Sequence, residues 1–206
     1  MGLRKGQHMK IVWKGKFDGN PDSLPHGEHK PGAVKFKEID DPKKLGLFMN
    51  LACIPVFVIA FALLLFRVDI EIMGKMDFLV GCVLALVCLV PHELLHAICF
   101  REESQIYTNL KSGMLFVVGT EDMSKGRFIF MSMLPNLVFG FLPFLLCMIF
   151  PSLTVLGALG ALSIGMGIGD YYNVFHALTQ MPKGARTYLY GFNSWWYLPE
   201  AQGVKK

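Results

Sequence analysis

The sequence predicts an all-α membrane protein with about four transmembrane helices, a small cytoplasmic β-hairpin and a short β or interfacial C-terminal segment. Composition is the first reason: 53% of the 206 residues are hydrophobic and only 17% are charged. Soluble domains carry about 25% charged residues. The second reason is a set of four apolar runs, each long enough to supply the roughly 20 residues of helix that cross a bilayer.

The first 44 residues form a polar leader that we expect to be a basic cytoplasmic segment. Ten of the 20 Lys and Arg residues lie in it, which predicts a solvated tail attracted to anionic lipid. Within it, MKIVWKGKF can form a short strand, whereas His26 and His29 are expected to be loop residues rather than metal ligands. The leader has neither the short basic start nor the cleavage site of a signal peptide, so we expect the first apolar run to be retained.

Residues 45–178 are the predicted membrane core. The four apolar runs extend over about 45–68, 78–100, 128–150 and 152–178. Eighteen Lys and Arg residues fall before the first run, between the second and third, or after the fourth, whereas Arg67 and Lys75 lie on the other side. The positive-inside rule therefore predicts a multi-pass protein of the cell membrane with both termini in the cytoplasm.

The polar stretches after the second and fourth runs are expected to hold the β structure. Two β-favouring runs, Ile106–Thr108 and Met114–Val118, flank the sequence NLKSG and predict a hairpin with Gly113 in its turn region. The C-terminal tail, residues 179–206, is rich in aromatic and turn-forming residues. A strand pair and an interfacial segment both fit that tail.

The second apolar run contains HELLH, which places ionisable side chains where membrane burial makes them costly. Four residues turn a helix by about 400°, so His92 and His96 share a face and lie about 6 Å apart along its axis. Both can reach one Zn²⁺ at about 2.0–2.1 Å. Glu93 is then expected to be the general base that takes a proton from zinc-bound water. A polar network without a metal is the structural alternative.

A catalytic zinc site needs a third protein ligand and an open position. Asp170 is the only carboxylate among the candidate third ligands, and His176 is the alternative. His92 and His96 lie 14 and 18 residues into the second run and Asp170 lies 18 residues into the fourth, which predicts a similar depth near the cytoplasmic side. Asn136 is expected either to donate to a substrate carbonyl or oxyanion or to form an interhelical hydrogen bond.

These motifs resemble those of the site-2 protease-like intramembrane zinc metallopeptidases: HELLH in one span, GD in a later span, and LPN in the span between them. The chain is similar in particular to a bacterial family of zincin peptidases over about Asp77–Glu200. The resemblance implies that His92, His96 and Asp170 bind zinc and that Glu93 is the general base. It also implies that a substrate helix is unwound and cleaved in a water-accessible pocket. The sequence GIGDYYN lacks the glycine that usually follows the aspartate.

We therefore predict a zinc metalloendopeptidase of the lipid bilayer, with a transmembrane protein as its substrate and no nucleic-acid partner. The alternative is a catalytically inactive membrane protein that binds a metal or a helix and regulates another protein. A di-iron desaturase or hydroxylase would need several histidine boxes, and the spans contain too few histidines. A single site with a general-base glutamate favours hydrolysis over metal transport.

Overall fold

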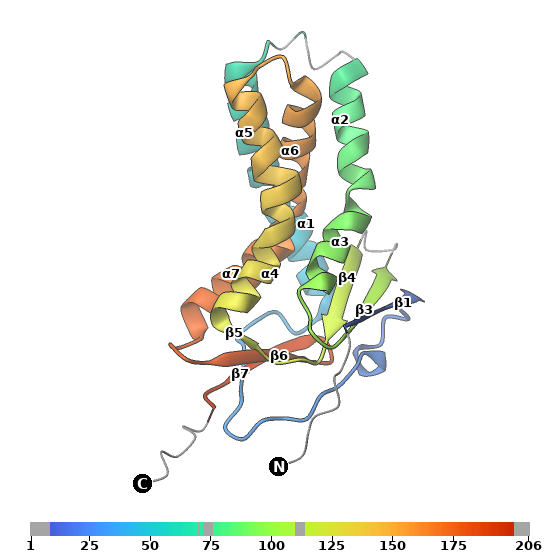
Figure 1. Cartoon of the computed structure of the whole chain (residues 1–206), viewed down its shortest axis with the longest axis vertical. Helices are drawn as coiled ribbons and strands as arrows, with labels where there is room; N and C mark the ends of the chain where they lie inside the picture. The colour runs from blue at the N-terminus through green and yellow to red at the C-terminus, as the bar shows by residue number, and fades with distance from the viewer. Residues whose placement is uncertain (1–8, 70, 72–75, 110–113, 200–206) are drawn as a thin grey trace. The chain divides into compact units, whose positions relative to one another are not determined.

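The computed structural model describes residues 9–69, 71, 76–109 and 114–199 (Figure 1). It is mostly helical, as expected, and its β structure forms two small sheets, which is more than the predicted hairpin and short C-terminal segment. The chain forms two compact units. The helical unit comprises Ile39–His96 and Met131–Asn173, and the sheet unit comprises the described residues of Met1–Glu38, Ala97–Phe130 and Val174–Lys206.

The helices match the four apolar runs of the sequence. They are α1 (Pro42–Arg67), α2 (Met76–Val87), α3 (Leu89–Ile98), α4 (Lys125–Pro135), α5 (Leu142–Ile149), α6 (Thr154–Met166) and α7 (Ile168–Gln180). A π-helical turn, Asn136–Phe141, joins α4 to α5. Three stretches are long and apolar enough to cross a membrane: Lys43–Arg67, Met76–Ile98 and Lys125–Ile149. The pair α6–α7, bent by 51°, is a fourth if it counts as one span.

Three of the four predicted spans are interrupted, each at or near a proline or a glycine. A proline has no N–H to donate, so Pro91 leaves the Val87 carbonyl without its helical partner, and a one-residue irregularity at Cys88 separates α2 from α3 within the stretch Met76–Ile98. Pro135 ends α4 and directly precedes the π-helical turn. Gly167 lies at the bend between α6 and α7. Of the predicted site residues, Asn136 lies on the π-helical turn, a type of turn that often occurs at functional sites.

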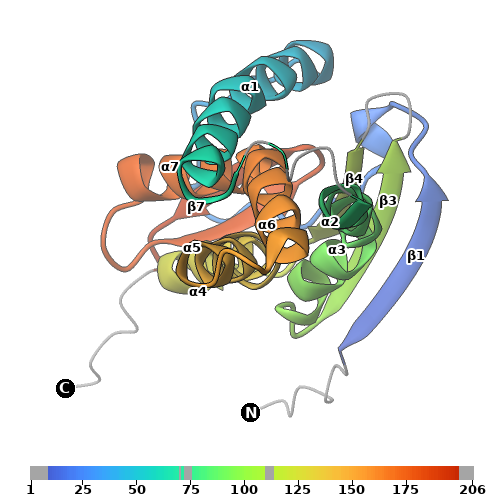
Figure 2. The same cartoon turned by 90° about the horizontal axis from the view of Figure 1, so that it is seen from above.

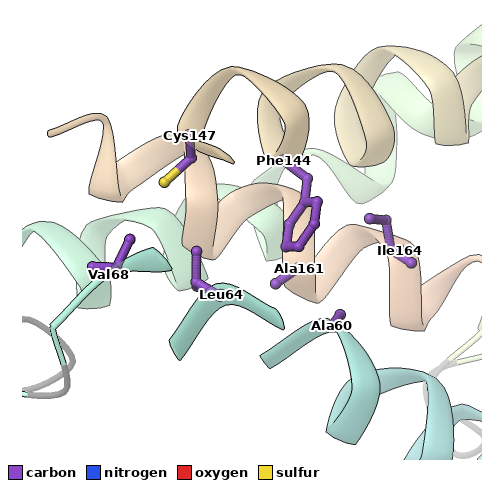
Figure 3. Packing of buried hydrophobic residues seen from close by; sticks show 7 residues of the cluster. All are labelled: Ala60, Leu64, Val68, Phe144, Cys147, Ala161 and Ile164. Carbon is purple, nitrogen blue, oxygen red and sulfur yellow. The ribbon is translucent and has the colours of Figure 1, made fainter. Parts of the chain in front are cut away.

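Helix α6 packs against α1, α2 and α5, and Figure 2 shows it between them. Glycines make these approaches close. A Cβ at Gly81 would lie 2.4 Å from the Val155 carbonyl oxygen, and a Cβ at Gly160 would lie 2.4 Å from the Phe144 backbone nitrogen. Small residues let apolar helices approach to this distance. The buried cluster beside α6 consists of Ala60, Leu64, Val68, Phe144, Cys147, Ala161 and Ile164 (Figure 3).

The first sheet contains the predicted hairpin. Strands β3 (Glu103–Asn109) and β4 (Met114–Gly119) pair antiparallel, with Ile106 opposite Val117. Gly113, expected in the turn, lies outside the described residues. The short strand that the sequence allows in MKIVWKGKF is present as β1 (Lys10–Lys16), within a leader expected to be a solvated tail, and it pairs parallel with β3. The leader is therefore ordered over this stretch because β3 offers an edge that no local sequence pattern reveals.

The second sheet has the strand order β2-β7-β6-β5. Its strands are β2 (Val34–Lys35), β5 (Met123–Ser124), β6 (Arg186–Tyr190) and β7 (Asn193–Tyr197). The C-terminal tail thus forms the strand pair, which was one of its two predicted forms. The Asp122 carboxylate supports this hairpin by accepting hydrogen bonds from Arg186 and from the Tyr197 hydroxyl.

Candidate metal centre

Helix α3 carries the HELLH motif on its inner turns. Helix α3 begins at Leu89, and the His92 N–H donates to the Cys88 carbonyl at 2.9 Å. The motif therefore lies on regular α-helix. The side chains of His92 and His96 are 16% and 10% exposed. Their ring centroids lie 4.9 Å apart. The spacing therefore brings both imidazoles to one buried face, as helical geometry requires of residues four apart.

Asp170 completes a triangle of donor atoms with the two histidines. The His92 Nε2 lies 3.1 Å from Asp170 Oδ2, and the His96 Nε2 lies 3.1 Å from Asp170 Oδ1. The two Nε2 atoms lie 3.2 Å apart. Ligands about 2.0–2.1 Å from a tetrahedral zinc are separated by about 3.3 Å. The three side chains are thus spaced as a tetrahedral zinc requires without rearrangement.

The three donor groups, two imidazoles and a carboxylate, are also of the kinds that bind a divalent metal ion. The His96 Nδ1 lies 2.9 Å from the Met131 carbonyl oxygen, which can only accept, so Nδ1 carries a proton and Nε2 is the atom that faces the other two groups. The His96 Nε2 faces the His92 Nε2 and the Asp170 carboxylate, and each of these groups can bind a metal ion through the atom that faces the others. A divalent metal ion satisfies all three at once, and the backbone contact orients the ring as such contacts do in zinc sites.

The bend between α6 and α7 sets the position of Asp170. Gly167 ends α6, and Asp170 lies in the first turn of α7, where its N–H donates to the Gly167 carbonyl at 3.0 Å. A straight continuation of α6 would direct residue 170 elsewhere, because the axis changes direction by 51° at this point. The bend is therefore part of the site.

Asn136, at the start of the π-helical turn, contacts Asp170. Its Nδ2 donates to Asp170 Oδ2 at 2.6 Å and to the Ser132 carbonyl at 3.3 Å. The side chain is almost fully buried, with 1% of its surface exposed. Both amide protons are therefore donated within the protein, and in this arrangement none remains for a substrate oxygen.

Glu93 belongs to the same cluster. One potential ligand atom from each of His92, Glu93 and His96 lies within 4.8 Å of the others, and the Glu93 side chain is buried. Its carboxylate is thus close to the two histidines, while Asp170 supplies the oxygens at 3.1 Å. This arrangement leaves Glu93 able to accept a proton beside a bound metal.

His176, the alternative third ligand, has other contacts. It lies in the sheet unit, where its Nδ1 is 2.5 Å from the Gln180 Nε2 and its ring is 6.4 Å from that of Phe36. The geometry favours Asp170 over His176 as the third ligand. His26 and His29, expected to be loop residues, pack against aromatic side chains, and the His29 ring stacks on Tyr190 at 4.0 Å.

Two contributions to the site are absent from the sequence-based prediction. The Met131 carbonyl fixes the His96 ring, and a backbone oxygen leaves no mark in a sequence. Gly167 gives the Asn136 side chain room, because a Cβ there would lie 1.8 Å from the Asn136 Oδ1. The glycine-rich stretch before Asp170 was the one available signal, but it did not distinguish Gly167 from the glycines that pack helices.

A buried HExxH helix with a nearby carboxylate is typical of metal-dependent hydrolases. Comparison with known families matches residues 83–186 to the family described as "Putative zincin peptidase", and the chain belongs to that family. The match includes His92, Glu93, His96, Asn136 and Asp170. No curated protein and no solved structure matches the chain. Membership suggests metallopeptidase activity with zinc, in agreement with the spacing of the donor atoms.

Proposed function

We propose that this protein is an intramembrane zinc endopeptidase of the site-2 protease-like type. It would hydrolyse a peptide bond of a membrane-protein substrate near the cytoplasmic side of the membrane. The observation that carries the proposal is the triangle of His92, His96 and Asp170 donor atoms, 3.1–3.2 Å apart on helices apolar enough to span a bilayer. Family membership supports the same chemistry.

The surface of the helices supports a location in the bilayer. Large apolar side chains on α1 are widely exposed, including Leu51 at 57%, Val58 at 61% and Ile59 at 60%. A monomer in water rarely presents so large an apolar surface. Lipid acyl chains would cover it.

The strand pairings support an even number of membrane crossings between the polar stretches. Strand β1 precedes the first span and pairs with β3, which follows the second; β2 and β5 share a sheet with β6 and β7, which follow the fourth. Hydrogen-bonded strands must lie on the same side of a membrane. All the polar stretches would then share one side, and their excess of Lys and Arg favours the cytoplasm for both termini.

The residues have separate tasks in the proposed reaction. His92, His96 and Asp170 would hold zinc, which when bound supplies a Lewis acid that polarises the scissile carbonyl and acidifies water. Glu93 would accept the proton of the attacking water on its carboxylate and then deliver it to the leaving amine. The buried walls of the site would exclude bulk water from the rest of the substrate and strengthen these interactions.

The test separates metal binding from proton transfer. Zinc is measured by elemental analysis of the protein purified in detergent, and cleavage is measured on a panel of single-span membrane proteins in vesicles. We expect about one zinc per chain in the wild type and in Glu93→Gln, but not in Asp170→Ala. Cleavage should fall by about 10²–10⁴ in Glu93→Gln. Proteolysis that survives Glu93→Gln would refute the mechanism, whereas zinc without cleavage of any substrate would favour the inactive regulator.

A further inference from the structure

A buried amide, that of Asn136, contacts the same Asp170 oxygen, Oδ2, that faces His92. Asn136 donates both amide protons, to Asp170 Oδ2 and to the Ser132 carbonyl. Both partners are acceptors, so the NH₂ group must face them and the Oδ1 must face the opposite way. The orientation of this amide is therefore fixed by chemistry.

The Asn136 Oδ1 faces the bend between α6 and α7. It is buried and accepts no hydrogen bond from the described residues, and the same holds for the Tyr171 hydroxyl. Both atoms are close to Gly167: a Cβ built on this glycine would be 1.8 Å from the Asn136 Oδ1 and 3.1 Å from the Tyr171 hydroxyl oxygen. In glycine a hydrogen occupies that direction, and it points at the amide oxygen in a weak Cα–H···O contact.

Gly167 is required here for space and not for its backbone conformation. Its φ of −73° and ψ of 10° are open to any residue. A methyl group at this position would have to move the amide by more than about 1 Å to reach an ordinary contact distance. Gly169, two residues further along, offers open space to a Cβ within 4 Å.

We propose that Asn136 is a positioning residue that holds the Asp170 carboxylate against the two histidines, and that Gly167 is glycine so that this amide can reach it. The Tyr171 hydroxyl is a neighbour of this pair, because a Cβ at Gly167 would also lie 3.1 Å from its oxygen. The inference rests on the proposed function, because it assigns these residues to the zinc ligand. It differs from a role for Asn136 in binding the substrate oxyanion, since its amide protons are already donated to Asp170 and Ser132.

The effect of such positioning on zinc affinity can be measured. Residues that orient a metal ligand typically contribute 10–100-fold to metal affinity, and catalytic constellations tolerate displacements of only about 0.5 Å. A shift of more than about 1 Å at Asn136 therefore exceeds what the site tolerates. We expect Asn136→Ala and Gly167→Ala each to weaken zinc binding by 10–100-fold, and Tyr171→Phe to weaken it by less.

The experiment is a double-mutant cycle on the full chain in detergent. Zinc affinity is measured by competition with a chromophoric chelator, and Co²⁺ is then substituted so that its visible absorption reports the ligand geometry. Asn136→Ala removes the oxygen that a methyl group at residue 167 would meet, so the double variant Asn136→Ala/Gly167→Ala should bind zinc no more weakly than Asn136→Ala alone. Coupled neighbours depart from additivity in this way.

Gly169→Ala is the matched control, since it makes the same change two residues further along, in the first turn of α7, without a neighbour to displace. It should retain wild-type zinc affinity and the wild-type Co²⁺ spectrum. Thermal unfolding without metal separates a fold defect from a ligand defect, because a positioning role moves the zinc affinity and the Co²⁺ spectrum beyond any change in apo stability. Wild-type affinity in Gly167→Ala, or strictly additive losses in the double variant, would overturn the inference while leaving zinc binding by the wild type intact. Failure of the wild type to bind zinc would instead overturn the proposed function.

Discussion

Gly160→Ala tests the helix packing that positions the bend carrying Asp170. A Cβ at Gly160 would lie 2.4 Å from the Phe144 nitrogen and 2.7 Å from the Gly140 carbonyl oxygen. Both are backbone atoms, so no side chain can rotate away and α6 must separate from α5. Overpacking of this kind costs about 1–3 kcal/mol, and we expect the upper part of that range, although the better helix propensity of alanine offsets up to about 1 kcal/mol.

The assay for Gly160→Ala is thermal unfolding in detergent, with circular dichroism as the signal. For a chain of this length each kcal/mol shifts Tm by about 2–4 °C, so a net loss of about 2 kcal/mol lowers Tm by about 4–8 °C. Gly126→Ala is the control, because a Cβ there meets nothing within 4 Å; its Tm should stay equal or rise slightly. A Tm for Gly160→Ala at or above that of the wild type would show that the two helices do not pack as described.

Three further outcomes are expected. Burial alone would raise the pKa of Asp122, but hydrogen bonds from Tyr197 and Arg186 outweigh it and hold the pKa below its ordinary value. Stability should therefore fall as the pH drops below about 4, and this fall in Tm at acid pH should be smaller in Asp122→Asn. Zinc at 100 times its Kd should add about 2.7 kcal/mol to the stability of the wild type, and calorimetry should find no such gain in Asp170→Ala. The Lys125 Nζ donates to two carbonyls at the C-terminal end of α7, at 3.2 and 2.7 Å; Lys125→Met should cost about 0.3–1 kcal/mol in chemical unfolding, and an unchanged midpoint would contradict this capping role.

Local patterns in the sequence were sufficient to predict the helices and the centre of the site. The four apolar runs correspond to α1, to α2 with α3, to α4 with α5, and to α6 with α7, because a bilayer-length run of apolar residues has few alternatives to a helix. The HELLH spacing predicted which side chains would share a face, since helical periodicity is a property of the local chain. The two β-favouring runs likewise predicted β3 and β4.

The features that the sequence did not reveal depend on residues far apart in the chain. The sequence allowed a short strand in MKIVWKGKF but did not reveal its partner, which is β3, where Lys10 lies opposite Glu103. The contact of Asn136 with Asp170 joins two helices, and the sequence left open whether that asparagine would face substrate or another helix. Neither pairing follows from propensity, because both depend on how tertiary packing brings separate elements together.

The parallel pairing of β1 with β3 has a consequence for how the protein is made. The two strands are about 93 residues apart in the sequence, and at about 5–20 residues per second the ribosome needs several seconds or more to supply the partner. Throughout that interval the β1 segment lacks its partner strand β3, and an unpaired strand can associate with other chains. Its lysines at positions 10, 14 and 16 keep the waiting segment charged, a common protection against premature β-sheet contacts.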